Sequence, residues 1–425
     1  MPGIQYIRAA APTLRILAIA LMASPAFAQP GPDGPLTEAM KLLSAGKPLA
    51  AIEHLETNAT DDDDPNTQIA KQMLPTMYSF VGKGTDGSAL AGPQRKLTNL
   101  PEGAESRPAL REILRQAQDK QIVIINEAHD APRDRAFIQS LAVELRELGF
   151  EYYAFEGLHE PGTVLGTRGF PTNSTGFYTQ EPAFGELIRE TLRLGYIAVE
   201  YEATGMVPSG DSAKDIATRE RTQAKNIRER ILAVNPQAKI LIHVGHDHVM
   251  EQPRTLGDQT ITWMAARLKQ ETGIDPLTID QTTHWAIDEE VAPPPTEHIV
   301  LAKESGYHTV GHFADKVDIQ VYHPPEKIEG GRPVWLREQP DRVAVSLPEA
   351  IQAKTGRLLI QAFYADEDAP ATGATGRKVP ADQLLLSADG PRPDLLLRSG
   401  HSYEIIVQNA AGEEVSRTMV DVTPD

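Results

Sequence analysis

The stretch QIVIINEAHDAPRDRAF, residues 121–137, decides the fold class of this chain. A short apolar run ends abruptly at Glu127, His129 and Asp130, and two arginines follow closely. Continuous apolar runs of this length are typical of strands that are buried on both faces of a parallel sheet. A carboxylate and an imidazole therefore follow a buried strand, at the place where functional groups of open α/β sheets gather.

The alternation of strand and helix continues from about residue 105 to about residue 290. Apolar runs separated by helical segments predict strands at 121–129, 151–157, 196–203, 238–248 and 276–282. Repeats of this kind predict an α/β domain with a mainly parallel sheet and helices on both faces. The segment 316–325 is a candidate for a further strand of the same sheet.

The rest of the chain divides into three further parts. Residues 1–28 have the pattern of a secretory signal peptide, with a basic start, an apolar core and an AFA cleavage site ending at Ala28. Residues 29–104 have a helical pattern and precede the α/β domain at 105–340. Residues 341–425 carry short strands between Gly, Pro and Asp turns, as in a small β-sandwich. We therefore expect a periplasmic or secreted protein without a transmembrane segment in the mature chain.

The composition excludes several partners and chemistries. The formal net charge of −18 argues against nucleic acid or an anionic membrane surface as the main partner. The 425 residues include no cysteine, which excludes disulfides, thiolate catalysis and a lipid-anchored cysteine. We expect a small-molecule or peptide ligand, and the β-sandwich is a candidate surface for a protein partner.

Acidic and imidazole side chains recur at the predicted strand ends, which converge at one end of a parallel sheet. In chain order they are Glu127, His129, Asp130, Glu156, Glu200, Glu202, His246, Asp247, His248, Asp280 and His284. One such residue alone more often caps a helix or pairs with an arginine, but their recurrence at successive strand ends favours a site. His243 lies within its strand and is predicted to be a packed core residue.

Two chemistries fit this cluster. Histidine nitrogens and carboxylate oxygens bind zinc, manganese or iron, and an open coordination position activates water. Alternatively, an imidazole beside a carboxylate acts as a general base on water without a metal. The nearby arginines, Arg133, Arg135 and Arg219, either pair with the carboxylates or bind an anionic group of a substrate.

Five short motifs resemble the erythromycin-esterase/ChaN-like (Tiki-type) superfamily. They are NEAHDAPRDRAF, FEG, YEA, RERTQAKNI and HVGHDH, and they occur within residues 105–290 in the order typical of the superfamily. Its hallmarks are an early strand end of the G-E-x-H type and a late one of the G-x-x-H type. The early motif falls on Glu127 and His129, and the late motif falls on Gly245 and His248.

The resemblance implies an α/β domain whose site lies between the early Glu/His pair and the late histidine. The intermediate acidic strand end of the superfamily falls on Glu156, its helix-borne arginine falls on Arg219, and Glu202 is a looser match. Members hydrolyse macrolide lactones with a histidine and water, act as metal-dependent peptidases, or bind haem. This chain departs from the pattern at Asn126, where the early motif has Gly, and in having no lipobox cysteine.

We therefore expect an exported hydrolase, either an esterase or a peptidase. The residues expected to be catalytic are Glu127, His129, Arg219 and His248. A divalent metal (zinc, manganese or cobalt) would be held by Glu127, His129, Glu156, Glu202 and His248. The residues expected to meet the substrate are Arg133, Arg135 and His246.

Two other functions remain open from the sequence. One is a haem- or iron-binding protein without turnover, whose axial ligand would be a histidine or one of Tyr152, Tyr153 and Tyr201. The other is a scaffold with a degenerate site, in which the flanking regions bind a partner.

Overall fold

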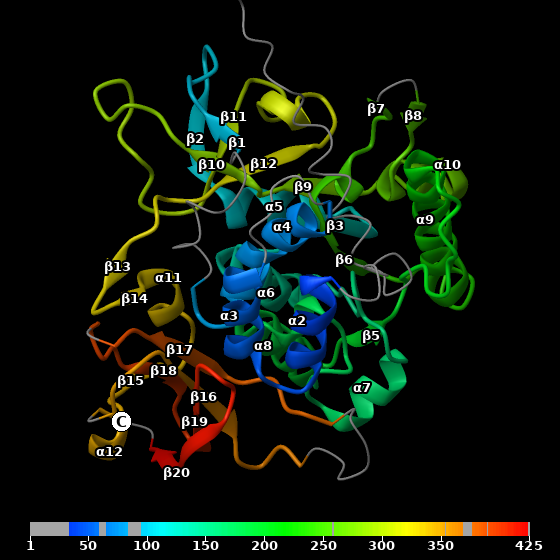
Figure 1. Ribbon diagram of the computed structural model, residues 1–425. Coiled ribbons are helices and arrows are strands. Elements are labelled where there is room, and N and C mark those ends of the chain that lie inside the picture. The colour runs from blue at the N-terminus through cyan, green and yellow to red at the C-terminus, as the bar shows by residue number, and fades with distance from the viewer. Residues whose placement is uncertain are drawn as a thin grey trace, which may run out of the picture.

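The computed structural model describes residues 34–58, 65–83, 95–256, 259–352, 354–368, 376–388 and 390–423 (Figure 1). The predicted signal peptide lies outside these residues. Among the described helices, none is both long enough and apolar enough to cross a membrane.

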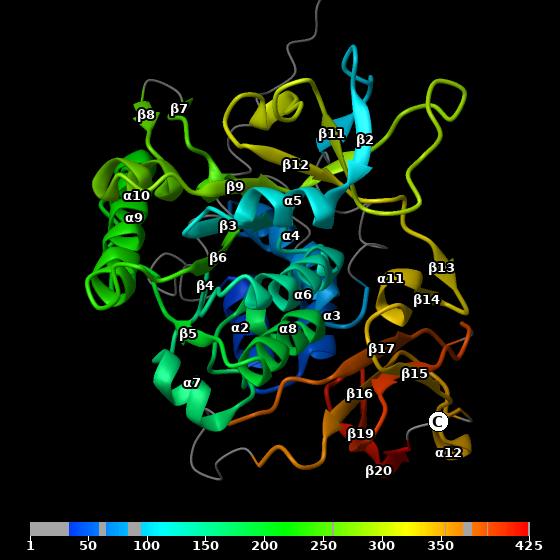
Figure 2. The same ribbon diagram turned by 180° about the vertical axis from the view of Figure 1, so that it is seen from behind.

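An eight-stranded mixed sheet forms the centre of the α/β region, with the strand order β2-β11-β12-β9-β3-β6-β4-β5 (Figures 1 and 2). Its strands are β2 (Glu105–Pro108), β3 (Ile122–Glu127), β4 (Tyr152–Phe155), β5 (Ile197–Val199), β6 (Ile240–Gly245), β9 (Leu277–Asp280), β11 (Ile299–Ala302) and β12 (Ile319–Tyr322). From β12 to β5 every neighbouring pair is parallel, as the continuous apolar runs predict. β12 confirms the further strand predicted at 316–325.

The edge of the sheet beyond β12 is antiparallel, which the sequence did not indicate. β11 pairs antiparallel with both β12 and β2. β2, with the sequence ESRP, has no apolar run, and β11 follows the Pro-rich break at 293–295. Neither strand therefore belongs to the strand–helix repeats from which the parallel sheet was predicted. The predicted parallel arrangement is found only from β12 to β5.

Helices cover both faces of the sheet. On one face lie α5 (Ala109–Ala117), α6 (Pro132–Glu147) and α8 (Pro182–Arg193), and on the other lie α9 (Ser212–Ile227) and α10 (Met264–Thr272). Successive side chains of a strand point to opposite faces. Val123 and Ile125 of β3 accordingly belong to the first core cluster, whereas Ile122 and Ile124 belong to the second.

The N-terminal helices form a separate layer. They are α2 (Pro35–Ser44), α3 (Pro48–Asn58) and α4 (Pro65–Ser79). These helices agree with the helical pattern predicted for this part of the chain, and Gly46 turns the chain between α2 and α3 with a φ of 73° that disfavours a side chain. Leu359, from the C-terminal sheet, is buried in the core of these helices. Arg357 extends this contact by pairing with Glu53 (2.7 Å).

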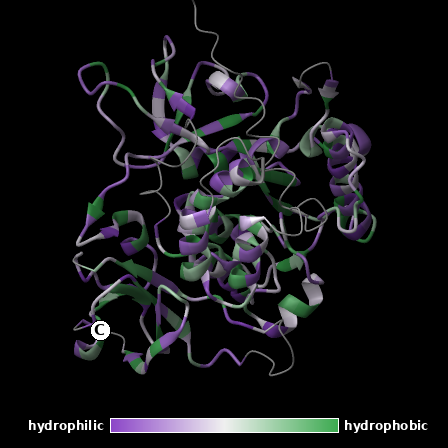
Figure 3. Ribbon diagram, viewed as in Figure 1, coloured by the Kyte–Doolittle hydropathy of each residue, from purple (hydrophilic) through white to green (hydrophobic). Residues whose placement is uncertain are grey.

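The C-terminal strands form two small antiparallel sheets around one core. The sheet β17-β16-β19-β20 comprises β16 (Leu358–Tyr364), β17 (Asp382–Leu386), β19 (His401–Asn409) and β20 (Glu414–Val422), and the pair β15 (Arg342–Val345) and β18 (Leu395–Arg398) packs beside it. In Figure 3, strand β17 is coloured as hydrophobic, in keeping with its buried residues. The short pair β15-β18 was not predicted from the sequence.

Smaller elements connect these layers. They are β1 (Arg95–Leu97) with β10 (Thr283–Trp285), β7 (Arg254–Leu256) with β8 (Gln259–Ile261), β13 (Ile328–Glu329) with β14 (Arg332–Pro333), and the helices α7 (Gly162–Arg168), α11 (Val334–Arg337) and α12 (Glu349–Gln352). The pairing of β1 with β10 brings Arg95 beside the carboxyl ends of the central strands.

Candidate active site

The candidate site lies where β3, β4, β5 and β6 end. In the sheet register, Glu127 at the end of β3 stands opposite Gly245 at the end of β6, and Phe155 of β4 stands opposite His243. The side chains at these strand ends therefore meet at one end of the sheet. They are Glu127, His129, Glu156, Glu202, His243 and His248, and all of them are buried.

Glu127 is the centre of the first half of the site. Arg135 clamps both of its carboxylate oxygens, with Nε and Nη2 each 2.7 Å away. The Nδ1 of His129 and the Nε2 of His243 each lie 2.9 Å from the same carboxylate. Burial raises the pKa of Glu127, but Arg135 and His243 outweigh burial and hold that pKa well below its usual range. Glu127 is therefore ionised and accepts hydrogen bonds from both imidazoles.

His129 is oriented for proton transfer by its neighbours. Because the Glu127 carboxylate only accepts, Nδ1 of His129 carries a proton and Nε2 of the neutral ring carries a lone pair. The ring stacks on Tyr178 with centroids 3.8 Å apart and planes inclined by 15°. Nε2 has no hydrogen-bond partner among the described residues. A ring held in one tautomer with a lone pair on Nε2 is suited to take a proton from water.

Arg219 organises the second half of the site from helix α9. It donates from Nε and Nη2 to Glu202 (3.0 and 2.8 Å) and from Nη2 to Glu156 (2.7 Å). Burial raises the pKa of Glu156, but the charges of His248 and Arg219 outweigh burial and hold that pKa far below its usual range. Glu156 and Glu202 are therefore two buried carboxylates that share one guanidinium.

His248 closes this half on the side of α9. Its Nε2 accepts from Nη1 of Arg219 (3.0 Å), which requires an unprotonated Nε2. Its Nδ1 lies 2.7 Å from Oε1 of Glu220, an ion-pair contact without the alignment of a hydrogen bond. Burial lowers the pKa of His248, but Glu220 and Glu156 together raise it above its usual value. The Arg219 contact and the two carboxylates thus favour opposite protonation states of this ring.

Gly245 joins the two halves. A Cβ at this position would lie 2.6 Å from Nε2 of His129 and 3.0 Å from Oε2 of Glu156, closer than such contacts allow for the ring. The Gly245 N–H also donates to Oε2 of Glu156. The imidazole of His129 and the carboxylate of Glu156 therefore face the same small space over the Gly245 backbone, and glycine is required there for close approach.

We expect Gly245→Ala to lower turnover strongly by displacing the His129 ring. A misplacement of about 1 Å in a catalytic group costs roughly 100-fold in rate, and overpacking costs about 1–3 kcal/mol of stability. Steady-state rates and urea unfolding measure both effects. Gly166→Ala is the matched control, because a Cβ at Gly166 in α7 meets nothing within 4 Å. Unchanged kcat in Gly245→Ala would contradict the placement of His129.

The turn after β6 is held by Asn126 and presents His246. His246 has a φ of 42°, an unusual value for a residue with a side chain, and its ring meets that of His129 edge-on, with centroids 5.0 Å apart. Burial, to which the positive charge of Arg95 adds, lowers the pKa of His246 to about 3. Asn126 donates from Nδ2 to the carbonyl O of His246 (2.9 Å) and to Asp280 (2.8 Å). Asn126 thus fixes the turn at the position where the superfamily motif has Gly.

Asp247 binds a group of three basic side chains on the outer side of this turn. Arg95 (3.0 Å) and His312 (2.7 Å) contact its Oδ1, and Arg254 (2.7 Å) contacts its Oδ2. Burial raises the pKa of Asp247, but His312, Arg95 and Arg254 outweigh burial and keep the carboxyl ionised. Two guanidinium groups on one carboxylate leave a net positive charge beside the candidate site. No local sequence pattern indicates this group, because its members are far apart in the chain.

Arg133 and Arg135, both predicted to bind substrate, lie on different sides of helix α6. Arg135 is fully buried and also donates to Glu181 (3.0 Å), the residue that caps helix α8. Arg133 instead donates to Nδ1 of His284 (2.7 Å) and to the carbonyl O of Pro324 (3.0 Å). The structure therefore places Arg135 against Glu127. Arg133 instead lies in a separate histidine cluster, which contains His284 and His298.

This histidine cluster predicts a loss of stability in mild acid. Burial, with the charge of Arg133, lowers the pKa of both His284 and His298 to about 4, whereas the unfolded chain titrates near 6.5. Because the unfolded state binds more protons between these values, the free energy of unfolding should fall as the pH drops from about 6.5 to about 4. Urea unfolding of the double variant His284→Asn/His298→Asn should show a shallower fall. His401→Gln, on an exposed histidine of β19, should leave the slope unchanged, and identical slopes in all three proteins would refute the cluster as the cause.

The other strand-end residues have structural roles. Glu200 accepts from the N–H of Gly162 at the start of α7 (2.8 Å) and pairs with Arg230 (2.8 Å), as a lone strand-end carboxylate commonly does. Asp280 is fully buried and accepts from Asn126, Thr282 and Gln320. Tyr178 and Glu220 belong to the site but were missed, because neither lies at a strand end.

The carboxylates predicted to hold a metal are already bound by cationic side chains. Arg135 occupies both oxygens of Glu127, and Arg219 bridges Glu156 and Glu202. A guanidinium between such ligands repels a second cation, so this donor set does not fit a divalent metal. Among the described residues, no group of three or more His, Asp and Glu side chains is arranged to hold a metal ion.

Two of the three tyrosines considered as haem ligands, Tyr153 and Tyr201, are also engaged. Tyr153 donates to Nδ1 of His243 (2.9 Å), and Tyr201 donates to the carbonyl O of His243 (3.0 Å). Both side chains are fully buried in the core around His243. Neither phenol is presented to a cofactor.

The fold and the site thus define a mixed α/β protein with a buried Glu/His/Arg cluster at the ends of its parallel strands. No family model and no curated protein matches the chain. Solved structures similar to it include bacterial protein toxins (12% identity over 55% of this chain and 55% of that chain, TM-score 0.30) and the type III effector HopBA1 (12%, 53% and 99%, 0.30). RRSP, a MARTX toxin effector domain from Vibrio vulnificus CMCP6, is similar at 13% identity over 58% of this chain and 56% of that chain, with TM-score 0.29. The match therefore spans little more than half the length of the first and third of these proteins, and TM-scores this low carry no argument about fold or function.

Proposed function

We propose that this chain is an exported ChaN/Tiki-like hydrolase that uses His129 as a general base on water. The observation that carries the proposal is the contact between Nδ1 of His129 and Glu127 (2.9 Å), which leaves the Nε2 lone pair facing the space over Gly245. In this mechanism, Nε2 removes a proton from water as the water oxygen attacks an ester or amide carbonyl. The same proton then passes to the leaving oxygen or nitrogen, so that His129 returns to its neutral form.

The remaining members of the cluster have supporting roles in this proposal. Glu127 holds the tautomer of His129 and stabilises the imidazolium that forms during the reaction. Glu156 faces the same space as Nε2 and accepts a hydrogen bond from the attacking water. Arg219 and His248 are positioning residues, since Arg219 holds Glu156 ionised and His248 holds Arg219. His246 lies half-buried beside His129, and this position supports the proposal that it contacts the substrate.

Because arginines already bind the carboxylates that would hold a metal, we favour the version of this mechanism that needs no metal. The full chain, secreted with residues 1–28 in place, is recovered from the periplasm without a metal-affinity column. Its N-terminus is expected at Gln29. It is then treated with a chelator and assayed against ester, lactone and peptide substrates, with elemental analysis of the same sample by mass spectrometry.

Turnover that persists in the metal-free sample supports the histidine mechanism. Near-stoichiometric zinc, manganese or cobalt that is lost in both His129→Ala and His248→Ala, together with turnover that needs the metal, would replace it with the metallohydrolase version. An absorbance band of bound haem and no turnover of any substrate would refute hydrolysis and favour the haem-binding alternative.

A further inference from the structure

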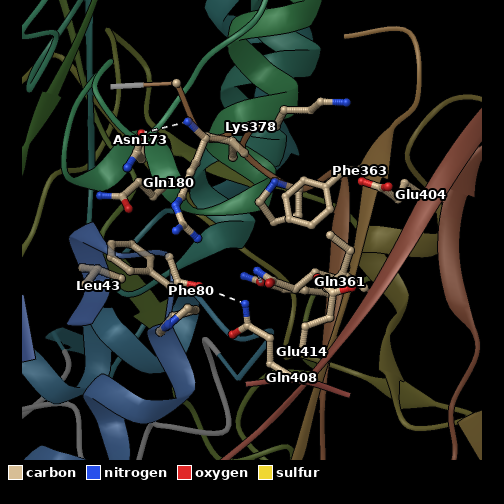
Figure 4. A pocket seen from close by; sticks show the side chains of 18 of the residues that line it. Leu43, Phe80, Asn173, Gln180, Gln361, Phe363, Lys378, Glu404, Gln408 and Glu414 are labelled. Atoms are coloured by element: carbon tan, nitrogen blue, oxygen red, sulfur yellow. Dashed lines mark hydrogen bonds between the residues drawn. The ribbon is translucent and has the colours of Figure 1, made fainter. Parts of the chain in front are cut away.

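The basic group around Asp247 lies beside the candidate active site and consists of Arg95, Arg254 and His312. A cavity of about 330 Å³ lies elsewhere, between the N-terminal helices and the C-terminal sheet (Figure 4). None of the residues discussed for the candidate active site lines that cavity. The basic group is therefore the feature from which the class of substrate can be inferred.

Three segments that are far apart in the chain bring this basic group together. Arg95 begins β1, Arg254 begins β7, and His312 lies between β11 and β12. The guanidinium of Arg95 lies over the ring of Phe313, with 4.4 Å between its central carbon and the ring centroid. Its Nη1 also donates to Oγ1 of Thr282 (2.8 Å). These contacts hold the guanidinium in one orientation, so little freedom remains to be lost when a ligand binds.

Both guanidinium groups keep N–H groups that are open to a ligand. Arg95 uses Nη1 and Nη2, and its Nε has no partner among the described residues. Arg254 contacts Asp247 and the ring of His312 through Nη1 (2.7 and 3.3 Å), and its Nε and Nη2 likewise have none. The side chains of Arg95 and Arg254 are 20% and 19% exposed. Neither arginine has a buried nitrogen without a partner in the described part of the chain, so these N–H groups reach solvent.

The direct contacts compensate only one of the two guanidinium charges. Asp247 is the only carboxylate that pairs with either arginine among the residues that the structure describes. Burial outweighs Asp247 and lowers the pKa of His312 below its usual value, so this ring adds no charge at neutral pH. Two charges of opposite sign lie further out. Lys316 donates to the carbonyl O of His312 (2.7 Å), and Asp280 accepts from the Thr282 hydroxyl (2.8 Å).

The basic group adjoins the ring that meets His129. Asp247 directly follows His246, whose ring lies edge-on to that of His129 with centroids 5.0 Å apart. Burial lowers the pKa of His246, and the charge of Arg95 adds to this effect, which places the guanidinium near the ring. His129 is buried, His246 is half-buried and Arg95 is partly exposed. The basic group is therefore the outermost of the three and adjoins the site on its solvent side.

We propose that the substrate carries a carboxylate, which binds the free N–H groups of Arg95 and Arg254 while its ester or amide carbonyl lies at His129. The inference rests on the proposed function for the carbonyl end of the substrate, but not for the binding of the carboxylate. Guanidinium N–H groups donate to carboxylates in strong, charge-assisted hydrogen bonds. The net charge of −18 repels anions from the chain as a whole, so a locally basic group selects where an anion binds.

Two kinds of substrate share this chemistry. The carboxylate can belong to the acyl part, as in a half-ester of a dicarboxylic acid. It can instead belong to the leaving part, as in an acylated hydroxy acid or amino acid. The experiments below distinguish the two.

Isothermal titration calorimetry tests the carboxylate site without turnover. The full chain with His129→Gln is titrated with glutaramate, which carries a carboxylate and an amide, and with valeramide, which has the same chain length but no carboxylate. Glutaramate is expected to bind at least tenfold more tightly, because hydrogen bonds to charged groups contribute at least this factor. The absence of any preference for glutaramate at concentrations up to ~10 mM, well above a millimolar Kd, would overturn the proposal.

Two variants in the same background tie the preference to the basic group. Arg254→Gln should remove the advantage of glutaramate over valeramide. Arg111→Gln, at an exposed arginine of α5, should keep it. Arg254→Gln leaves Arg95 and His312 on Asp247, so the turn should be retained, and circular dichroism checks the fold. An unchanged advantage in Arg254→Gln would refute this placement of the carboxylate.

Steady-state rates on two matched pairs of esters show which part of the substrate carries the carboxylate. Mono-para-nitrophenyl glutarate is paired with para-nitrophenyl valerate, and para-acetoxybenzoate is paired with its methyl ester. The ratio of wild type to Arg254→Gln cancels the intrinsic reactivity of each ester. For one acidic ester, kcat/KM should fall at least tenfold more than for its neutral partner, mainly through KM. A selective fall for the glutarate ester identifies the acyl part, and one for para-acetoxybenzoate identifies the leaving part.

The outcomes separate this inference from the proposed function. Hydrolysis by the wild type with equal falls in both pairs would refute the carboxylate site and leave the hydrolase proposal intact. A preference for glutaramate that Arg254→Gln removes, with no hydrolysis of any ester, would support the carboxylate site and count against the proposed function.

Discussion

His129→Gln should abolish most of the hydrolytic turnover while leaving the fold intact. Removing a positioned general base costs about 10²–10⁴-fold in rate. Glutamine keeps a polar side chain beside Glu127 but has no lone pair of suitable basicity at the place of Nε2. We therefore expect kcat to fall by at least 100-fold, measured on an ester, lactone or peptide that the wild-type protein hydrolyses, with KM changed far less.

Two further variants separate the role of His129 from a general effect on the site. Glu127→Gln should lower kcat less than His129→Gln, because a neutral amide still contacts the ring but no longer stabilises its charged form. His401→Gln, at an exposed histidine on β19, is the matched control and should retain full activity. Wild-type kcat in His129→Gln, in a protein with unchanged circular dichroism, would rule out His129 as the base.

Arg135→Leu should be the most destabilising single substitution among the charged residues of the site. The guanidinium of Arg135 is fully buried, and its removal leaves Glu127 and Glu181 without this cationic partner in an apolar environment. Breaking one partner of a buried ion pair typically costs about 3–5 kcal/mol. Urea unfolding at neutral pH measures the loss, which we expect to exceed that of any exposed arginine substitution.

A double-mutant cycle shows whether the loss comes from the pair itself. Adding Glu127→Gln to Arg135→Leu removes the stranded charge, so the double variant should be more stable than Arg135→Leu alone. Arg111→Leu on α5 provides the control and should stay within about 0.5 kcal/mol of wild type. A loss below about 1 kcal/mol in Arg135→Leu would mean that Glu127 does not depend on this clamp.

Some strands of the central sheet could be predicted from the sequence, and others could not. The runs that became β3, β4, β6 and β9 could be read from the sequence, because strands buried on both faces must be continuously apolar. The strands β2 and β11 could not, since β2 has no apolar run and β11 follows a Pro-rich break. Their antiparallel pairing depends on long-range contacts that no local pattern records.

Part of the candidate site could likewise be predicted from the sequence, and part could not. Glu127, His129, Glu156, Glu202 and His248 could be predicted to converge, because their strand ends are marked by a change from apolar to ionisable residues. The chemistry assigned to them depended on their partners. The clamp of Arg135 on Glu127 and of Arg219 on Glu156 and Glu202 was not visible in the sequence, where these arginines looked equally suited to a substrate.

The sequence by itself thus determined the strand ends, the ionisable residues that occupy them and the absence of any thiol chemistry. Only the tertiary structure decided which carboxylates are neutralised, which nitrogen of His129 stays available and why position 245 is glycine. The physical reason is that hydrophobic periodicity is a local property of the chain. Ion pairing and close packing are instead set by residues brought together from distant strands and helices, as Glu127, Arg219 and Gly245 are here.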